Sequence, residues 1–105
     1  MMDIDHEVRE SVCDLTRYDY VMMTDVIGIM VHFGGKEYKN LISRAGRIAA
    51  QLVREGKITA GDLREDGFAA WDSTPEESAA RIERETREYE ESGREVDFGD
   101  IAWFS

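Results

Sequence analysis

The chain has 105 residues, of which 42% are hydrophobic and 10% are aromatic, and this is enough apolar material for one domain with its own core. Its formal net charge of −10 argues against a nucleic-acid-binding protein, because such proteins gain most of their affinity by neutralising phosphates with basic side chains. No apolar run reaches the roughly 18 residues that span a membrane, so we expect no membrane contact. We treat residues 1–105 as a single domain.

The charge is distributed unevenly along the sequence. Residues 36–57 contain six lysines or arginines and two glutamates, whereas residues 58–105 contain five arginines and fourteen acidic residues. An acidic segment of this kind attracts cationic partners and speeds their association. The simpler interpretation is that the charge keeps the protein in solution.

The single cysteine, Cys13, cannot form a disulfide within the chain, which is typical of proteins in a reducing compartment. The first seven residues are acidic and lack the basic and then apolar arrangement of a signal peptide. We therefore expect a cytoplasmic protein.

Two helices are predicted in the first third of the sequence, over residues 3–17 and 22–33. In the first, apolar side chains recur at helical spacing: Ile4, Val8, Val12 and Leu15. The second is apolar almost all round, which is typical of a buried central helix, although a buried strand is the alternative for its β-branched residues. Thr24 is the expected N-cap, Gly28 would allow another helix to cross closely, and Gly34 would end the helix.

The clearest pattern in the sequence predicts a helix over residues 37–55. Its apolar positions follow the helical period: Tyr38, Leu41, Ile42, Ala45, Ile48, Ala49, Leu52 and Val53. Gly56 lies where a residue in the left-handed conformation ends a helix. The opposite face is basic and carries Lys39, Arg44, Arg47 and Arg54.

Residues 57–72 break the helical pattern. Short apolar pieces are separated by Gly61-Asp62 and Asp66-Gly67, two dipeptides that are typical of turns. We therefore predict a small β-hairpin in this segment, comparable with the wing of a winged-helix domain.

A capping box marks the start of the last predicted helix. In Thr74-Pro75-Glu76-Glu77, the threonine is the N-cap, the proline occupies the first helical position and Glu77 can bond back to the N-cap. The helix should end near Glu91, before Gly93. Along it, the sequence predicts Glu-to-Arg ion pairs four residues apart: Glu77–Arg81, Glu83–Arg87 and Glu90–Arg94.

The chain closes with an aromatic tail that contains Phe98, Trp103 and Phe104. These side chains would be costly to expose to water, so we expect the tail to pack on the core as a short strand or an extended lid. The predicted fold is therefore mainly α, with about four helices and a small β-hairpin. A winged-helix-like arrangement, α+β with a minor sheet, fits the same order of elements.

The sequence contains no pattern that indicates catalysis, a metal or a cofactor. It has no glycine-rich phosphate loop, no closely spaced pair of cysteines and no metalloprotease helix motif. His6 and His32 lie on different predicted helices, and we interpret Cys13 and His32 as packing or capping residues. We therefore predict no catalytic residue, no metal site, no cofactor and no enzymatic activity.

Two functions remain, and they use different parts of the chain. The basic helix 37–55 follows a tight glycine connection, as the recognition helix does in helix-turn-helix proteins, so a winged-helix-like regulatory or nucleic-acid-binding domain is the alternative. The favoured function is a protein-binding module with a basic protein as its partner, because aromatic side chains among carboxylates are typical interface anchors. The predicted partner-binding residues are Asp62, Glu65, Asp66, Trp71, Asp72 and Trp103. Core packing is the alternative for the two tryptophans.

Several segments carry a resemblance to known proteins: Asp19-Tyr20-Val21-Met22-Met23-Thr24-Asp25-Val26, Gly61-Asp62-Leu63 with Gly67-Phe68 and Trp71, Glu76-Glu77 with Arg81-Ile82, and Gly99-Asp100-Ile101-Ala102-Trp103-Phe104. Their order and spacing over residues 18–105 resemble a group of short, uncharacterised bacterial proteins that are common in actinomycetes. A looser similarity, carried by no motif, is to small immunity proteins, which are compact, acidic, cytoplasmic and non-enzymatic and neutralise bacterial toxins. That similarity implies a function in immunity and assigns no residue a role.

Overall fold

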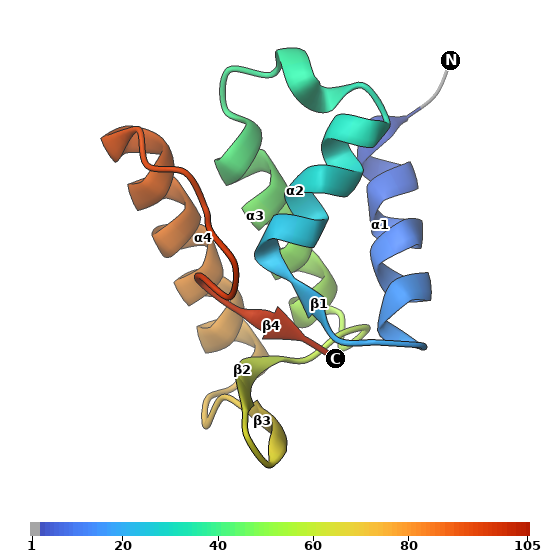
Figure 1. Ribbon diagram of the computed structural model, residues 1–105, viewed down its shortest axis with the longest axis vertical. Coiled ribbons are helices and arrows are strands. Elements are labelled where there is room, and N and C mark those ends of the chain that lie inside the picture. Colours follow the sequence, from blue (N-terminus) through green and yellow to red (C-terminus); the bar gives the residue numbers. More distant parts are fainter. Residues whose placement is uncertain (1–2) are drawn as a thin grey trace.

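The computed structural model describes residues 3–105, and Figure 1 shows a bundle of helices with a small sheet at one end. Its helices are α1 (Ile4–Thr16), α2 (Met23–His32), the short 3-10 helix η1 (Gly35–Glu37), α3 (Leu41–Arg54) and α4 (Pro75–Ser92). Its strands are β1 (Val21–Met22), β2 (Ala60–Arg64), β3 (Gly67–Ala70) and β4 (Trp103–Phe104). The predicted mainly α fold with a small hairpin is confirmed.

Helix α3, and not the predicted helix 22–33, occupies the centre of the bundle, since it contacts α1, α2 and α4. Small buried residues allow its neighbours to approach from several sides: Ala45, Gly46, Ala49 and Ala50. One side of α2 is open, because Val31 is 38% exposed, His32 faces solvent and a Cβ at Gly28 would meet no atom within 4 Å. The predictions of a buried central helix and of a close crossing at Gly28 are therefore wrong.

The close crossing lies instead between α3 and α4, which form the most extensive contact between two elements of the fold. Gly46 of α3 faces Thr86 of α4, and a Cβ at Gly46 would come 2.7 Å from the Thr86 Cβ. The missing side chain thus lets the two helices approach each other. Thr86 is fully buried, and its hydroxyl donates to the Ile82 carbonyl at 2.8 Å, so the contact leaves no unpaired hydroxyl.

Within residues 3–105, the ion pairs of α4 are not the predicted ones. The pairs along the helix have the opposite polarity and are Arg81–Glu85 at 2.7 Å, with Arg84–Glu88 and Arg87–Glu91 at 4.0 Å. The predicted glutamates have other partners. Glu83 binds Arg54 of α3 through two hydrogen bonds of 2.6 and 3.1 Å, and Glu90 accepts the N–H groups of Ile42 and Ser43 at the start of α3. Glu83 and Glu90 therefore bond to α3 rather than to the arginine four residues further along α4.

Most turn and cap signals around the hairpin and the last helix are confirmed. In the hairpin, Arg64 pairs with Gly67 on either side of the turn. The Thr74 hydroxyl accepts the Glu77 N–H at 3.1 Å, and the Glu77 carboxylate accepts the Thr74 N–H at 2.9 Å, which is the predicted capping box. The exception is Gly61-Asp62, which lies inside β2 rather than in a turn.

Two predicted helix starts are wrong. Thr24 is not an N-cap, because α2 begins one residue before it. The predicted helix 37–55 begins only at Leu41. Gly35 is buried against Met30, where a Cβ would come 2.8 Å from the Met30 carbonyl oxygen, and residues 35–37 form the short helix η1 between α2 and α3.

The sheet is antiparallel with the strand order β1-β4-β2-β3, so the last strand of the chain lies between two earlier ones (Figure 1). Phe104 pairs with Val21 of β1 on one side and with Ala60 of β2 on the other. All three residues are buried. Trp103 and Phe104 of the aromatic tail therefore form a short strand, as one of the two predictions for the tail stated, and Phe104 is in the core. Phe98 is 74% exposed, so the expectation that the tail packs on the core is wrong for this residue. The hairpin is part of this sheet rather than a separate wing.

Gly46→Ala and Gly28→Ala place the same methyl group in the middle of a helix and form a matched pair. Gly46→Ala should lower the free energy of unfolding by about 1–3 kcal/mol, because it overpacks the crossing against Thr86. Gly28→Ala should raise it by about 0.5–1 kcal/mol, because alanine is the better helix former and the site is open. Urea denaturation followed by circular dichroism measures both, and equal effects would contradict the close crossing.

Candidate protein-binding surface

The sheet has two faces, and the two predicted tryptophans lie on opposite ones. In an antiparallel sheet, residues directly opposite each other share a face, and neighbours along a strand alternate between faces. Trp103 is opposite Gly61, whereas the Trp71 N–H donates to the Ala60 carbonyl at 3.1 Å, which places Trp71 opposite Ala60. Because Ala60 and Gly61 are adjacent, the strand pairing separates Trp71 from Trp103.

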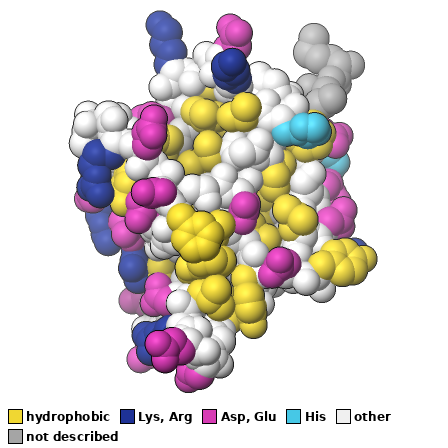
Figure 2. All heavy atoms as spheres, in the orientation of Figure 1, with side chains coloured by type: hydrophobic (Ala, Val, Ile, Leu, Met, Phe, Trp, Pro, Cys, Tyr) yellow, Lys and Arg dark blue, Asp and Glu magenta, His cyan; other side chains and the backbone are white. Residues whose placement is uncertain are grey.

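The face that carries Trp103 has a layer of exposed and half-buried hydrophobic side chains, which we call the aromatic face: Tyr20, Leu63, Phe68, Phe98 and Trp103. The rings of Tyr20 and Phe68 stack with their centroids 5.7 Å apart, and Phe98 meets Trp103 edge-on at 5.7 Å. Phe98 is 74% exposed and Tyr20 41%. Figure 2 shows hydrophobic side chains gathered over β4 and the strands beside it.

Gly61 makes the aromatic face possible. A Cβ at this position would come 2.7 Å from Phe68 Cζ, so the Phe68 ring lies directly over the backbone of β2. From there the ring reaches Tyr20, which precedes β1 on the far side of β4. A stack between residues 48 positions apart in sequence thus crosses the sheet through the space that a glycine leaves.

Carboxylates surround the aromatic face. The predicted residues Glu65 and Asp66 form the exposed turn of the hairpin, next to Phe68 in sequence. Asp19 precedes Tyr20 and Asp97 precedes Phe98, and in each case the carboxylate accepts the N–H of the aromatic residue at 2.8 Å. These local bonds fix the loops that present the rings and keep the negative charges beside them.

Trp71 and Asp62 lie on the other face of the sheet, and Asp72, beyond the end of β3, lines the same depression; all three are predicted interface residues. The guanidinium carbon of Arg81 lies 3.7 Å from the centroid of the Trp71 ring, and the indole N–H donates to Asp62 Oδ1 at 3.3 Å. Together with Arg64 these residues line a shallow depression of about 350 Å³. Trp71 is half-buried and its ring is already covered by an arginine, so it is a weaker anchor than the aromatic face.

The prediction from sequence missed four residues of the aromatic face, Tyr20, Leu63, Phe68 and Phe98. Phe98 carried a usable signal, because an aromatic residue between Asp97 and Gly99 is typical of an exposed turn. Tyr20 and Leu63 carried none, since their position depends on the pairing of strands from distant parts of the chain.

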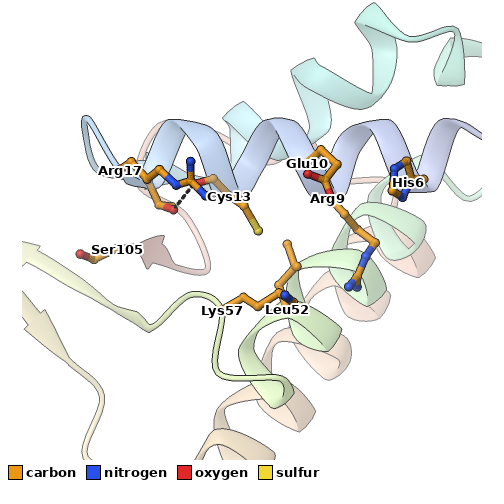
Figure 3. Close-up of a pocket in the computed structure, with 9 residues that line it drawn as sticks. His6, Arg9, Glu10, Cys13, Arg17, Leu52, Lys57 and Ser105 are labelled. Carbon is orange, nitrogen blue, oxygen red and sulfur yellow. Dashed lines mark hydrogen bonds between the residues drawn. The ribbon is translucent and has the colours of Figure 1, made fainter.

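A separate cavity of about 530 Å³ lies between α1 and the segment that follows α3. Figure 3 shows the Cys13 sulfur pointing into it, with Arg9 from α1, Arg17 directly after this helix and Lys57 on the opposite wall. Burial raises the pKa of the Cys13 thiol, and the nearby Lys57 ammonium lowers it by a smaller amount. The thiol therefore stays protonated to higher pH than an ordinary cysteine, which makes it a poor nucleophile.

The cations around this cavity are largely neutralised by neighbouring carboxylates. Arg9 pairs with Glu55 at 2.7 Å and Arg17 with Asp14 at 3.6 Å. Among residues 3–105 no cluster of three or more His, Cys, Asp or Glu side chains is placed to hold a metal ion. None of the helices in this range is long and apolar enough to cross a membrane.

Comparison with protein-family models, with curated proteins and with solved structures finds no match for this chain. The resemblances drawn from the sequence therefore stay predictions.

The raised pKa of Cys13 predicts slow reaction with iodoacetamide. At pH 8 the folded protein should be alkylated more slowly than the same protein in urea, because a smaller fraction of the thiol is ionised and access is restricted. Lys57→Ala should slow the reaction further, since it removes the charge that lowers this pKa. Mass spectrometry of timed samples gives the rates, and faster alkylation of the folded protein would contradict the assignment.

Proposed function

We propose that the protein is a binding module for a basic protein partner and that it binds through the aromatic face. The observation that carries this proposal is the layer of exposed aromatic side chains, held by stacking contacts on a hydrogen-bonded sheet. Large aromatic side chains in a contiguous exposed patch are the typical anchors of protein interfaces. Because the sheet already holds the rings in place, little conformational freedom is lost when a partner binds.

The charge around the aromatic face favours a basic partner. Glu65 and Asp66 at the hairpin turn and Asp97 beside Phe98 are exposed, and the whole chain has a net charge of −10. Carboxylates at the rim of an interface act mainly on the rate of association, while the desolvated rings at its centre act on the rate of dissociation. The two groups of residues thus have separable effects.

Within this class, we propose that the partner is a basic bacterial toxin that the protein neutralises in the cytoplasm, as small immunity proteins do. Two features support the proposal: the compact acidic fold and the preformed binding face. An immunity protein needs a tight and selective surface rather than a reaction centre.

The alternative, a nucleic-acid-binding domain that uses the basic face of α3, has less support. Arg44 pairs with Asp5 at 3.1 Å, and Arg54 donates to Glu83 and Glu76. Phosphate contacts would have to break these pairs, and the carboxylates left behind would repel the nucleic acid. We therefore favour the protein partner.

Three variants of the immobilised protein test the proposal in a capture experiment from native lysate. Phe98→Ala removes an exposed anchor and should raise the dissociation rate of the captured protein about tenfold. The double variant Glu65→Lys with Asp66→Lys should slow association about tenfold at low salt, because it reverses the charge at the rim. Its matched control, Glu10→Lys with Glu37→Lys, makes the same change in net charge away from the hairpin and should bind as the unmodified protein does.

Tyr18→Ala is the matched control for the aromatic substitution, because Tyr18 is 87% exposed and lies outside the aromatic face. Surface plasmon resonance with the captured protein, identified by mass spectrometry, gives both rates. Capture that is unchanged in all variants, or a captured partner that is acidic, would contradict the proposed function. Neutralisation is tested by co-expression, in which the protein should protect cells from the captured partner and Phe98→Ala should not.

A further inference from the structure

β3 is the outermost strand of the sheet, and β2 is its only neighbour there. The pairing with β2 determines which main-chain groups of β3 point outward. Trp71 and Ala60 form a hydrogen-bonded pair, so the alternation of an antiparallel ladder makes Phe68 and Ala70 the non-hydrogen-bonded positions of β3. Their N–H and C=O groups therefore point away from β2, toward the open edge.

The other side of β2 supports this assignment. Thr59 and Ser105 exchange two main-chain hydrogen bonds, of 2.8 and 3.0 Å, so the main chain of Thr59 faces the strand that contains β4. Main-chain groups two residues apart on a strand face the same way, so Gly61 also directs its main chain toward β4 and not toward β3. The same alternation leaves the main-chain groups of Phe68 and Ala70 on the side of β3 that faces away from β2. Ala70 is exposed, so the edge is accessible.

β3 also lacks the features that usually block an open edge. Its sequence is Gly-Phe-Ala-Ala, with no lysine, no proline and no other charged residue. Charge is found instead just beyond its ends, where Glu65 and Asp66 form the turn before it and Asp72 follows Trp71. The edge is therefore an apolar hydrogen-bonding template with a carboxylate at each end.

We propose that the β3 edge binds an extended basic segment of the partner as an additional antiparallel or parallel strand. This proposal rests on the proposed function and specifies how the partner is held. Main-chain bonds to Phe68 and Ala70 would supply affinity, and lysine or arginine side chains at the two ends of the segment would meet Glu65, Asp66 and Asp72. Alternate side chains of the added strand would lie beside Phe68 on the aromatic face.

Charge selects such a partner over a second copy of this chain. Pairing two β3 edges would bring two sets of the same carboxylates close together, and each chain carries a net charge of −10. Like charges across a strand pair are destabilising. A basic segment instead gains attraction at both ends of the strand, and this attraction should weaken as salt is added.

The probe is a blocked octapeptide in which lysine alternates with valine, and its binding is followed through the amide resonances of the ¹⁵N-labelled protein. We expect the amides of Phe68 and Ala70 to shift, and to exchange more slowly with solvent when the peptide is bound. A second peptide, N-methylated on alternate residues so that one edge cannot donate, should bind at least tenfold more weakly. A third, with glutamate in place of lysine, should not bind.

Ala70→Pro removes the outward N–H from the protein side, and proline is tolerated at such a position of an edge strand. It should weaken binding of the lysine peptide at least tenfold, whereas the matched control Ala70→Val should stay within about twofold. Circular dichroism and urea denaturation check that the fold is kept. Should Ala70→Pro fail to fold, the comparison of the methylated and unmethylated peptides decides alone.

Strand addition is overturned if the lysine peptide does not bind, if methylation has no effect, or if the shifts exclude Phe68 and Ala70. The same variants in the capture experiment separate the two proposals. A partner whose capture depends on Phe98 but not on the Ala70 N–H would keep the binding module and overturn strand addition. A partner that is indifferent to Phe98, Glu65 and Asp66 would overturn the binding module itself.

Discussion

The contact between Gly46 and Thr86 determines the geometry on which the rest of the structure depends. It sets how closely α3 and α4 approach, and the bonds from Arg54 to Glu83 and from the start of α3 to Glu90 hold the same two helices along their length. β2 follows α3 in the chain and β4 follows α4. β2 and β4 are the central pair of the sheet, so the sheet joins the segment after α3 to the segment after α4. The position of the aromatic face therefore depends on how α3 and α4 cross.

The crossing also decides which of the many carboxylates remain for a partner. Glu76, Glu83 and Glu90 are used within the fold, by Arg54 or by the N-terminus of α3. Glu65 and Asp66 lie at the hairpin turn, which projects away from α3 (Figure 1). The ion pairs leave the net charge of −10 unchanged, and the hairpin is a place where negative charge stays available to a partner.

Most local signals predicted the structure correctly, with the N-cap at Thr24 and the turn at Gly61-Asp62 as exceptions, whereas the contacts between distant segments were not predicted. The capping box at Thr74 and the glycines after α3 and α4 act within a few residues, so their patterns are sufficient. Whether Gly28 or Gly46 lies at a close helix crossing depends on which helix packs against it. The residues near each glycine in the sequence do not carry this information. The division of the predicted interface residues between the two faces of the sheet could not be predicted for the same reason. Trp71 and Trp103 are separated by a strand pairing between segments about forty residues apart in the sequence.

The alternation along β4 ties the fold to the proposed binding surface. Phe104 is fully buried between β1 and β2, so its neighbour Trp103 must lie on the opposite face, where the helices do not cover the sheet. Any change at Trp103 therefore risks disturbing the strand that closes the core. Phe98 lies before this strand and is 74% exposed, so its ring contributes to the aromatic face while its loss leaves the pairing of β4 intact. A substitution at Phe98 should therefore affect binding without affecting the fold, whereas a substitution at Trp103 affects both.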